Sequence, residues 1–369
     1  MSLTIVADDL TGACDSGTLF AGGAPVPVTV WPQAPPPAAV RIVDTETRSR
    51  MPDEAARRVR EAAIAVPGTR YFKKIDSTLR GRIGAEVDAM LAVTGAPGAL
   101  VCPAFPAQGR VVLDRLLLVD GLAVADTALA ADPDFPDPPA RGGSSGSSVV
   151  ELLRGQIDRP LAWVPIDQVR ESANLLSARL RRLEGTVAIA DAESEADLDA
   201  LVDAALTLDP PPLLVGSAGL ARALAERLGF LAEPVSLAPG RRWLIVAGSR
   251  HPATRRQVEA AREAGLRVLV TPDTDVRGRT RAAARLAAET KRVLEREGAD
   301  VVAVTGGETA LAVYQALGAT RIDLIGAPAP GLAFGYLRSA AYPELAFLTK
   351  AGGFGVPELF VSLAKEVLA

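Results

Sequence analysis

Residues 3–17 of the sequence, LTIVADDLTGACDSG, set a pattern that the rest of the chain repeats. Leu3–Ala7 is a short apolar run that predicts a strand, and Asp8 and Asp9 follow it directly. The apolar spacing over Thr11–Ala21 then predicts a helix. A strand that leads through polar residues into a helix is the unit of an α/β fold, in which ligands bind at the carboxyl ends of the strands. We therefore expect Asp8 and Asp9 at the binding edge of a sheet.

The same alternation recurs along the whole chain and predicts an α/β protein with largely parallel sheets. In the first part, the expected strands are Leu3–Ala7, Val40–Val43, Arg70–Lys73, Ala99–Cys102, Thr186–Ala190 and Pro211–Val215. The helices expected with them are Thr11–Ala21, Pro52–Ala65, Ile83–Ala92, Leu175–Leu183, Glu195–Thr207 and Leu220–Leu228. In the second part, the expected strands are Trp243–Ala247, Arg267–Thr271, Val301–Thr305, Ile322–Ile325 and Leu345–Thr349. The helices expected there are Thr254–Ala264, Thr280–Glu297, Thr309–Ala316 and Val356–Glu366.

The length of 369 residues suggests two domains, at about 100–200 residues each. Periodicity is lost over residues 231–242, LAEPVSLAPGRR, where two prolines appear, and this predicts a linker. We expect domains at residues 1–230 and 243–369, each a largely parallel sheet flanked by helices. Residues 132–148, DPDFPDPPARGGSSGSS, are rich in Pro, Gly and Ser and predict an exposed loop.

Composition excludes several classes of protein. With 49% apolar and 23% charged residues, the chain is not of the disordered class. The 40 basic and 44 acidic side chains give a net charge of -4, so there is no basic excess for nucleic-acid binding. We expect no membrane span, because no window approaches 18 uninterrupted apolar residues. A secretory signal is not expected either.

Scarce residue types narrow the chemistry further. Cys14 and Cys102 are the only cysteines, too few for a disulfide framework, and this fits a reducing, cytoplasmic environment. His251 is the only histidine, which excludes a multi-histidine metal centre. Acid–base chemistry is therefore expected from carboxylates or lysines, and His251 is interpreted as lining a pocket or facing solvent. Arginine outnumbers lysine 35 to 5, so the position of each lysine is informative.

Two motifs after strands in the first part carry charged side chains. Asp8 and Asp9 are suited to holding substrate hydroxyls or a hydrated Mg²⁺, and the alternative is that one of them caps the following helix. Residues 73–81, KKIDSTLRG, combine two lysines, Asp76 and Arg80. This set can clamp an anionic substrate and supply a carboxylate base, and the alternative is a surface ion-pair cluster.

Two further strand ends lie between and after these motifs. Asp44 and Arg48, in DTETR, are placed either in the same cleft or at a solvated strand end. Residues 102–110, CPAFPAQGR, form a rigid loop whose Gln108 and Arg110 are candidates for substrate contact. Cys102 is interpreted as structural, because no activating base is near it in the sequence.

Glycine-rich turns follow three strands of the second part. They are Ala247–Arg250 (AGSR), Thr305–Ala310 (TGGETA) and Lys350–Gly355 (KAGGFG). Glycine lets backbone N–H groups approach phosphate oxygens, and a helix N-terminus adds favourable potential. Three such turns at one sheet edge favour a nucleotide pocket over ordinary turns. The sequence lacks the P-loop pattern, and it also lacks a dinucleotide fingerprint after the first strand. Val215–Ala221 (VGSAGLA) is either a helix start or a turn that places Ser217 in an interdomain cleft.

Taken in order, these motifs resemble the four-carbon acid sugar kinase family. The resemblance rests on ADDLTGACDSG, DTETRS, KKIDSTLRG, CPAFPAQGR, GSAGLARAL, GSR, TGGETA, PGLAFG and LTKAGGFG, from Ile5 to about Phe360. It implies an N-terminal domain for the acid sugar, a C-terminal domain for the nucleotide and an active site in the interdomain cleft. The implied reaction is ATP-dependent phosphorylation of the C-4 hydroxyl of threonate, erythronate or a 3-oxo-tetronate. By similarity, ATP contacts Ser249, Gly306, Gly307, Glu308, Thr309, Gly352 and Gly353.

The substrate side follows as a hypothesis. The substrate-binding residues are Asp8, Asp9, Asp44, Arg48, Lys74, Asp76 and Arg80. Arg80 and Lys74 would clamp the carboxylate of the acid, and either Asp76 or Asp9 would accept the C-4 proton. Asp8, Asp9 and Asp44 would orient hydroxyls or metal. Mg²⁺ would bridge the ATP phosphates and keep several waters, so few protein ligands are expected.

The sequence departs from the family in one segment. A DPxTP-like stretch is represented only by Thr127 and Asp132-Pro133, and the Pro/Gly/Ser-rich residues follow it. Two alternatives to a kinase remain: another sugar-acid enzyme (oxidoreductase, isomerase or aldolase) and a two-domain sugar-acid sensor. The identity of the acid and the oligomeric state, including a homodimer, are left open by the sequence.

Overall fold

The computed structural model describes residues 2–136, 144–237, 242–249, 251–271, 278–353 and 355–365. The chain forms two compact units. The first consists of Met1–Ser16 and Val30–Leu231, and the second of Gly17–Thr29 and Ala232–Ala369. Residues 17–29 fall within the expected first domain, and by their contacts they group with the second unit, where Val26–Val28 pairs with a strand. Part of the expected linker, residues 238–241, lies outside the described residues.

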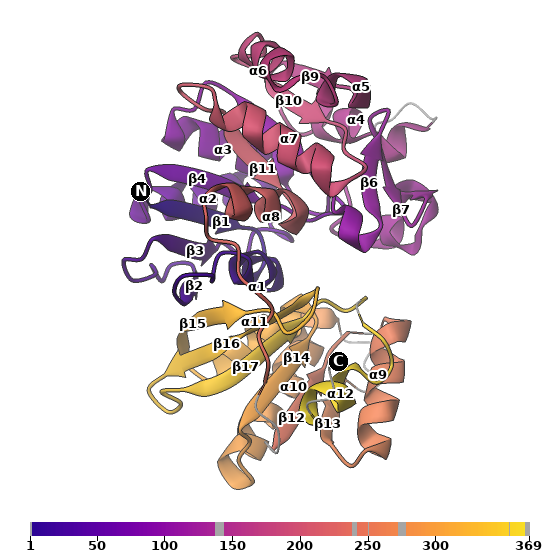
Figure 1. Ribbon diagram of the computed structural model, residues 1–369. Helices are drawn as coiled ribbons and strands as arrows, with labels where there is room; N and C mark the ends of the chain where they lie inside the picture. Colours follow the sequence, from indigo (N-terminus) through magenta and orange to yellow (C-terminus); the bar gives the residue numbers. More distant parts are fainter. Residues whose placement is uncertain are drawn as a thin grey trace. The chain divides into compact units, whose positions relative to one another are not determined.

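The first unit is built on a parallel sheet (Figure 1). Its strand order is β3 (Val40–Asp44), β1 (Leu3–Ala7), β4 (Arg70–Lys74), β11 (Leu213–Gly216), β5 (Ala99–Cys102), β10 (Val187–Ala190) and β9 (Leu161–Val164). The pairings in this sheet are parallel, as expected from the alternation of strands and helices. The expected strand positions agree with these within about two residues, and β9 was not predicted.

Helices of the first unit flank this sheet in two packed groups (Figure 1). One group is α2 (Pro52–Ala65) with α3 (Ile83–Thr94), and the other is α6 (Ala173–Arg181), α7 (Glu195–Leu206) and α8 (Ala218–Arg227). The remaining helices are α1 (Leu10–Thr18), α4 (Val149–Arg154) and α5 (Ile166–Val169). Short 3-10 turns lie at Pro106–Gln108, Val124–Asp126, Ala128–Ala131 and Ser144–Ser147.

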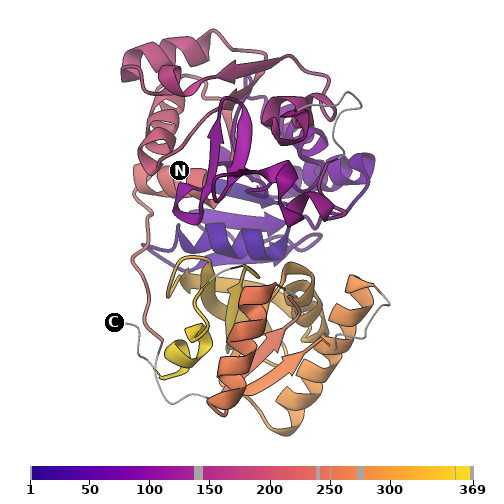
Figure 2. The same ribbon diagram turned by 90° about the vertical axis from the view of Figure 1, so that its right-hand side faces the viewer.

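A small antiparallel sheet of the first unit was not predicted from the sequence. It consists of β6 (Arg110–Leu113), β7 (Leu116–Val119) and β8 (Leu122–Ala123), with β6 and β7 drawn as purple arrows in Figure 2. The buried carboxylate of Asp191 accepts the backbone N–H groups of Asp114 (3.0 Å) and Arg115 (3.1 Å) at the tip of this hairpin. The hairpin that carries Arg110 is therefore fixed to the end of β10.

The sheet of the second unit has a parallel part, as expected, and an antiparallel extension that was not predicted. Strands β13 (Arg267–Val270), β12 (Trp243–Ala247), β14 (Val301–Thr305) and β17 (Leu345–Lys350) are parallel. The sheet then continues antiparallel through β16 (Leu332–Ser339), β15 (Ala319–Gly326) and β2 (Val26–Val30). The sequence signal for β2 is weak because it contains Pro27, which cannot donate to a ladder.

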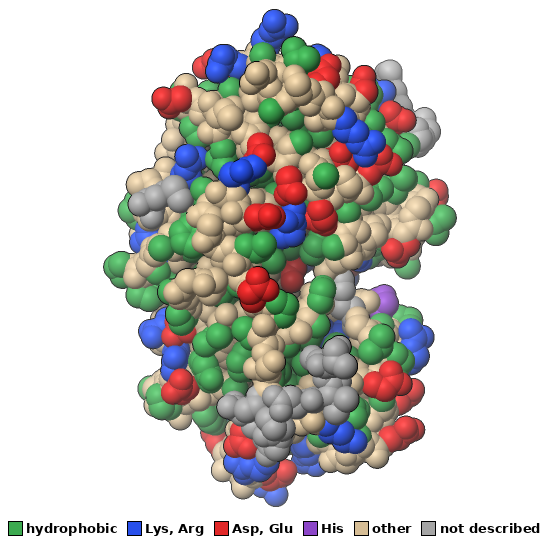
Figure 3. All heavy atoms as spheres, viewed as in Figure 1, with side chains coloured by type: hydrophobic (Ala, Val, Ile, Leu, Met, Phe, Trp, Pro, Cys, Tyr) green, Lys and Arg blue, Asp and Glu red, His purple; other side chains and the backbone are tan. Residues whose placement is uncertain are grey.

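The helices of the second unit are α9 (Pro252–Glu263), α10 (Arg279–Arg296), α11 (Gly307–Ala316) and α12 (Leu359–Lys365). The last begins three residues later than predicted. Its buried residues Leu359, Phe360 and Leu363 pack in a core with Trp243 and Leu348. Acidic and basic side chains are interspersed over the face shown in Figure 3, as the near-balanced charge implies. Within the described residues, no helix has both the length and the apolar character that crossing a membrane requires.

Candidate functional site

Three adjacent strands of the first unit bring the predicted charged residues to one edge. Ala7, the last residue of β1, is in register with Asp44 on β3 and with Lys74 on β4. The residues that follow each strand end therefore emerge side by side at the carboxyl edge of the sheet. In a parallel sheet this is the edge at which ligands bind.

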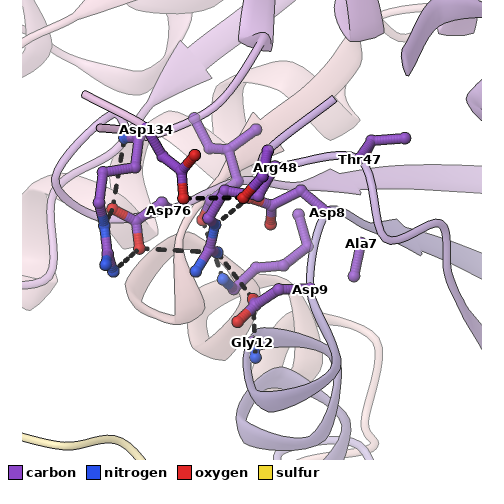
Figure 4. A network of polar contacts seen from close by, with 12 residues as sticks. Ala7, Asp8, Asp9, Gly12, Thr47, Arg48, Asp76 and Asp134 are labelled. Atoms are coloured by element: carbon purple, nitrogen blue, oxygen red, sulfur yellow. Dashed lines mark hydrogen bonds and ion pairs between the residues drawn. The ribbon is translucent and has the colours of Figure 1, made fainter. Parts of the chain in front are cut away.

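Arg48 is the centre of the resulting network (Figure 4). Its Nε donates to Asp8 Oδ2 at 2.7 Å, and its Nη2 donates to Asp9 Oδ1 at 2.7 Å. A longer ion pair of 3.6 Å joins Nη2 to Asp76 Oδ1. One guanidinium thus bridges carboxylates from two motifs that are almost 70 residues apart in the sequence.

Asp9 caps the following helix, which is one of the two interpretations that the sequence left open. Its carboxylate accepts Thr11 Oγ1 (2.6 Å) and the backbone N–H of Gly12 (3.0 Å), so it caps the start of α1. The same carboxylate is paired with Arg48. Asp9 is therefore held rigidly while its side chain remains 13% exposed.

Asp76 accepts hydrogen bonds from within the loop that follows β4. Its Oδ2 accepts Thr78 N (3.1 Å), the Thr78 hydroxyl and Arg80 Nε (3.0 Å), and its Oδ1 accepts Arg80 Nη2 (2.8 Å). The Nε/Nη2 edge of Arg80 is thus occupied by Asp76. The expected contact of Arg80 with the substrate carboxylate would therefore be made through Nη1, which also lies 3.5 Å from Asp132 Oδ2.

Electrostatics keep these carboxylates ionised. Burial alone would raise the pKa of Asp8, but the charges of Arg48, Lys73 and Lys74 outweigh it and hold the pKa below its ordinary value. Burial likewise opposes ionisation of Asp76, yet Arg80 and Arg48 hold its pKa well below the ordinary range. The result is a preformed array of fixed charges.

The two adjacent lysines have different roles because strand side chains alternate between faces. Lys73 is fully buried and pairs with the buried carboxylate of Glu86 on α3 at 2.7 Å. Lys74 points to the site instead. Its Nζ donates to Ile75 O (2.9 Å) and lies 2.8 Å from the point that a Cβ of residue 12 would occupy.

Asp44 lies beneath the network rather than in it. Its side chain is fully buried, and Oδ1 accepts the backbone N–H of Glu46 at 2.9 Å. Burial and the neighbouring Glu46 raise the pKa of Asp44 well above its ordinary value. The expected role of Asp44 in orienting hydroxyls or metal would need its buried carboxyl to be reached by the ligand.

The glycine-rich turns of the second unit also converge. A Cβ added to Gly352 would overlap Ser249 Oγ, and one added to Gly306 would lie 3.3 Å from the backbone N of Ser249. Gly306 has a φ of 102°, which favours glycine, and it is the N-cap of α11 with no side-chain cap hydrogen bond. The helix begins with the backbone N–H groups of Gly307, Glu308 and Thr309, and helix N-termini are places where anions commonly bind.

Side chains under these turns hold them in place. Thr309 contacts Gly248 so closely that a Cβ there would overlap its hydroxyl. The Gly352 carbonyl accepts Thr254 Oγ1 (2.8 Å) and the Nζ of fully buried Lys350 (3.1 Å). Burial lowers the pKa of Lys350 to about 8. His251 caps α9 through Nδ1, which accepts Ala253 N at 3.2 Å. A Cβ added to Gly353 would lie 3.5 Å from its Nε2.

Two other sequence interpretations are resolved. Ser217 is buried and caps α8, accepting Gly219 N (3.1 Å) and donating to Ala104 O (2.7 Å), so this turn is a helix start. Burial raises the pKa of Cys102 to about 12, which leaves it an inert thiol, as expected.

Sequence reasoning missed several residues of the site. Asp15 stands in the quoted first motif, and burial raises its pKa to about 6, with Asp9 adding to the shift and Lys74 opposing it. Glu86 could have been found from its position on the buried face of an amphipathic helix. Asp132 and Asp134 carried no such signal, because they stand in the stretch read as an exposed loop. Among the residues that the structure describes, no group of three or more His, Cys, Asp or Glu is arranged to hold a metal ion.

Two family models match different parts of the chain. Residues 3–224 match the model of a sugar-binding N-terminal domain, and residues 273–360 match that of a nucleotide-binding C-terminal domain. A D-threonate kinase of Salmonella typhimurium is 31% identical over 96% of this chain and 96% of its own. A D-erythronate kinase of Heliobacterium modesticaldum is 27% identical over 96% and 94%, and a 3-oxo-tetronate kinase of Cupriavidus necator is 29% identical over 99% and 97%.

Two solved structures are similar over nearly the whole chain. One from Salmonella typhimurium has a TM-score of 0.81 and 22% identity, covers 99% of each chain and shows the shared fold. Another, from Bordetella bronchiseptica, is described as a domain-swapped dimer with bound citrate. It has a TM-score of 0.52 and 30% identity, and covers 98% of this chain and 97% of that chain.

Proposed function

The chain belongs to the four-carbon acid sugar kinase family, and on that premise we propose that it transfers the terminal phosphoryl group of ATP to the C-4 hydroxyl of a four-carbon sugar acid. The substrate class is threonate, erythronate or 3-oxo-tetronate, the acids for which the relatives are named. The observation that carries the proposal is the fixed array around Arg48, which offers both charges and carboxylate oxygens at the ligand-binding edge of the sugar-binding domain.

The acid is bound in this array by Lys74, Arg48 and the Nη1 side of Arg80, which also forms an ion pair with Asp132. Lys74 supplies a positive charge to the substrate carboxylate. Within the described residues, the Nζ of Lys74 donates one hydrogen bond, to the Ile75 carbonyl. The two arginines are already oriented by Asp8, Asp9 and Asp76, so little side-chain entropy is lost when the acid binds.

We assign the proton acceptor to Asp9. A carboxylate has about four lone-pair sites. Asp76 already accepts from Thr78 and Arg80 through both its oxygens, and its pKa is held well below the ordinary range, which makes it a weak base. Asp9 accepts from Thr11, Gly12 and Arg48, keeps capacity for a substrate hydroxyl and is partly exposed. Asp76 instead holds Arg80 in position.

ATP is assigned to the second unit. The N-terminus of α11 at Gly307, Glu308 and Thr309 suits phosphate oxygens, and Gly306 and Gly352 leave room beside Ser249 that a Cβ would fill. Mg²⁺ would enter with ATP and neutralise charge on the phosphates, and such an ion needs few protein ligands. Catalysis then depends on positioning the hydroxyl and the phosphoryl group in line.

The rival functions are less well supported. An oxidoreductase, isomerase or aldolase would not need a nucleotide-binding C-terminal domain of this type, and the full-length relatives are named as kinases. A sugar-acid sensor would bind the acid without consuming ATP. We also propose a cytoplasmic homodimer. The two buried free cysteines support a cytoplasmic location. The dimeric Bordetella structure supports a homodimer, which light scattering can test.

ADP formation with each acid and ATP·Mg²⁺ tests the function. We expect turnover with one or more of threonate, erythronate and 3-oxo-tetronate, and a product phosphorylated at C-4. The matched control is Gly307→Val, which should abolish ATP binding in calorimetry by blocking the α11 N-terminus. Acid binding without ADP formation would support the sensor instead, and a Gly307→Val variant that binds ATP normally would refute the phosphate site.

A further inference from the structure

Residues Asp132–Pro136, from the stretch read as an exposed loop, lie against the acid-sugar site. The side chain of Asp134 accepts Ser49 Oγ at 2.8 Å, and its backbone carbonyl accepts the N–H of Gly81 at 2.8 Å. Ser49 directly follows Arg48, and Gly81 directly follows Arg80. One residue is therefore bonded to both loops that carry the arginines of the site (Figure 4).

The segment itself is well anchored in the described structure. Asp132 Oδ1 accepts the N–H of Asp134 at 3.0 Å, and the Asp132 carbonyl accepts that of Phe135 at 2.9 Å. The Phe135 side chain is buried, at 8% exposure. Asp132 Oδ2 also forms an ion pair of 3.5 Å with Arg80 Nη1. This turn is closed by its own hydrogen bonds and anchored by a buried ring. It is therefore rigid enough to restrict the movement of the loops that it contacts.

The two arginine loops meet closely where the segment joins them. A Cβ at Gly81 would lie 3.6 Å from Cα of Arg48, and the φ of 108° at Gly81 favours glycine. Arg48 and Arg80 repel each other, and Asp76 lies between them at 3.6 Å and 2.8 Å. Asp76 contacts the two guanidinium groups, while Asp134 accepts hydrogen bonds from the Ser49 side chain and the Gly81 backbone in the two loops behind them.

We propose that Asp134 is a positioning residue that sets the spacing of Arg48 and Arg80, and through that spacing decides which four-carbon acid the site accepts. The inference rests on the proposed function of the site. Stereoisomers of such acids differ by the direction of single hydroxyls, so their discrimination depends on donor positions that are fixed to a fraction of an ångström. The nucleotide lies in the other unit, so ATP binding is independent of this spacing.

The test is a double-mutant cycle of Ser49→Ala and Asp134→Ala, with steady-state kinetics on each acid and on ATP. Each single change removes the same hydrogen bond, so we expect each to raise KM for the preferred acid about threefold to tenfold. The double variant should be no worse than the more affected single variant. KM for ATP should stay within about twofold, and the ratio of kcat/KM between acids should fall.

Asp134→Asn supplies the rescue, because its amide oxygen can still accept from Ser49 Oγ, and it should behave nearly as wild type. Asp158→Ala is the matched control, since Asp158 is exposed and precedes β9 at the opposite edge of the sheet. Circular dichroism checks that each variant folds. If Asp134→Ala does not fold, Ser49→Ala and Asp134→Asn decide the question alone.

Failure of the proposed function and failure of the positioning role of Asp134 give different results. If wild type neither binds nor phosphorylates any of the acids, the proposed function falls and this inference falls with it. If wild type is active but Ser49→Ala leaves KM and discrimination unchanged, or if the two changes are additive, only the positioning role is overturned. An equal rise in KM for the acid and for ATP would also overturn it, because it would indicate a general structural defect.

Discussion

The Nζ of Lys74 lies 2.8 Å from the position that a Cβ of Gly12 would occupy, and Asp9 Oδ1 lies 2.5 Å from the same point. The start of α1 is thus packed directly against two charged groups of the site. A side chain at residue 12 has no space unless Lys74 or Asp9 moves, and Asp9 is held by Arg48.

Gly12→Ala should therefore affect acid binding far more than the stability of the fold. Alanine is the better helix former by about 1 kcal/mol, and this gain offsets part of the cost of displacing Asp9 and Lys74, so the free energy of unfolding should change little or fall slightly. Displacement of Lys74 and Asp9 should raise KM for the acid by about tenfold or more, since a misplacement of about 1 Å can cost two orders of magnitude. Urea unfolding and steady-state kinetics give the two numbers, and an unchanged KM would show that residue 12 is not at the site.

Asp9→Asn and Asp76→Asn distinguish the proton acceptor from the carboxylate that holds Arg80. We expect Asp9→Asn to lower kcat by about 10²-fold or more, a typical contribution of general base catalysis. Asp76→Asn should act mainly on KM for the acid, because it releases Arg80. A kcat for Asp76→Asn that falls as far as that of Asp9→Asn would argue against this assignment.

The Lys73–Glu86 pair predicts a purely structural effect. Both side chains are at most 1% exposed, and removing one partner leaves an uncompensated buried charge. Lys73→Met should lower the free energy of unfolding by about 3–5 kcal/mol. The double variant Lys73→Met/Glu86→Leu should recover much of that loss, and thermal unfolding of the three proteins compares them. Strictly additive losses would mean that the two charges do not interact.

Lys350 predicts a specific pH dependence of stability. Burial lowers its pKa to about 8 from 10.5, so between these values the unfolded chain binds more protons than the folded one. Stability contributed at this residue therefore improves as pH rises through that range. Relative to Lys350→Met, wild type should gain up to about 3 kcal/mol between pH 7 and 10.5, measured by urea unfolding. Parallel pH curves for the two proteins would contradict a buried, titrating lysine.

Gly352→Ala predicts a selective loss of nucleotide binding. The added methyl would overlap Ser249 Oγ and push apart two of the converging turns. Calorimetry should show ATP affinity reduced by about tenfold or more, with acid affinity unchanged. Gly23→Ala, at a position with no atom within 4 Å of the added Cβ, is the matched control and should bind ATP normally.

Local sequence signals located the strand ends but not every role of the residues that follow them. The adjacent lysines at 73 and 74 looked equivalent in composition, although the two-residue period of a strand separates them into a buried partner of Glu86 and a site residue. Asp44 was expected directly after a strand, but it is the last residue of β3, and its side chain is fully buried, with the Glu46 N–H as a hydrogen-bond donor. The proximity of Asp44 and Glu46 could not be predicted from the sequence. It depends on the local backbone, where Glu46 adopts a φ of 51° that few non-glycine residues use.

The sequence by itself determined the alternation of strands and helices, the two α/β units and the motifs at the strand ends, because periodicity and turn chemistry act over a few neighbouring residues. The tertiary structure alone decided that β3 and β4 flank β1, and this order is what brings Arg48 to Asp8, Asp9 and Asp76. It also decided that Asp134 contacts the loops of Arg48 and Arg80 and that β2 pairs with the second unit. Such contacts depend on packing between residues far apart in the chain, and no local pattern encodes them.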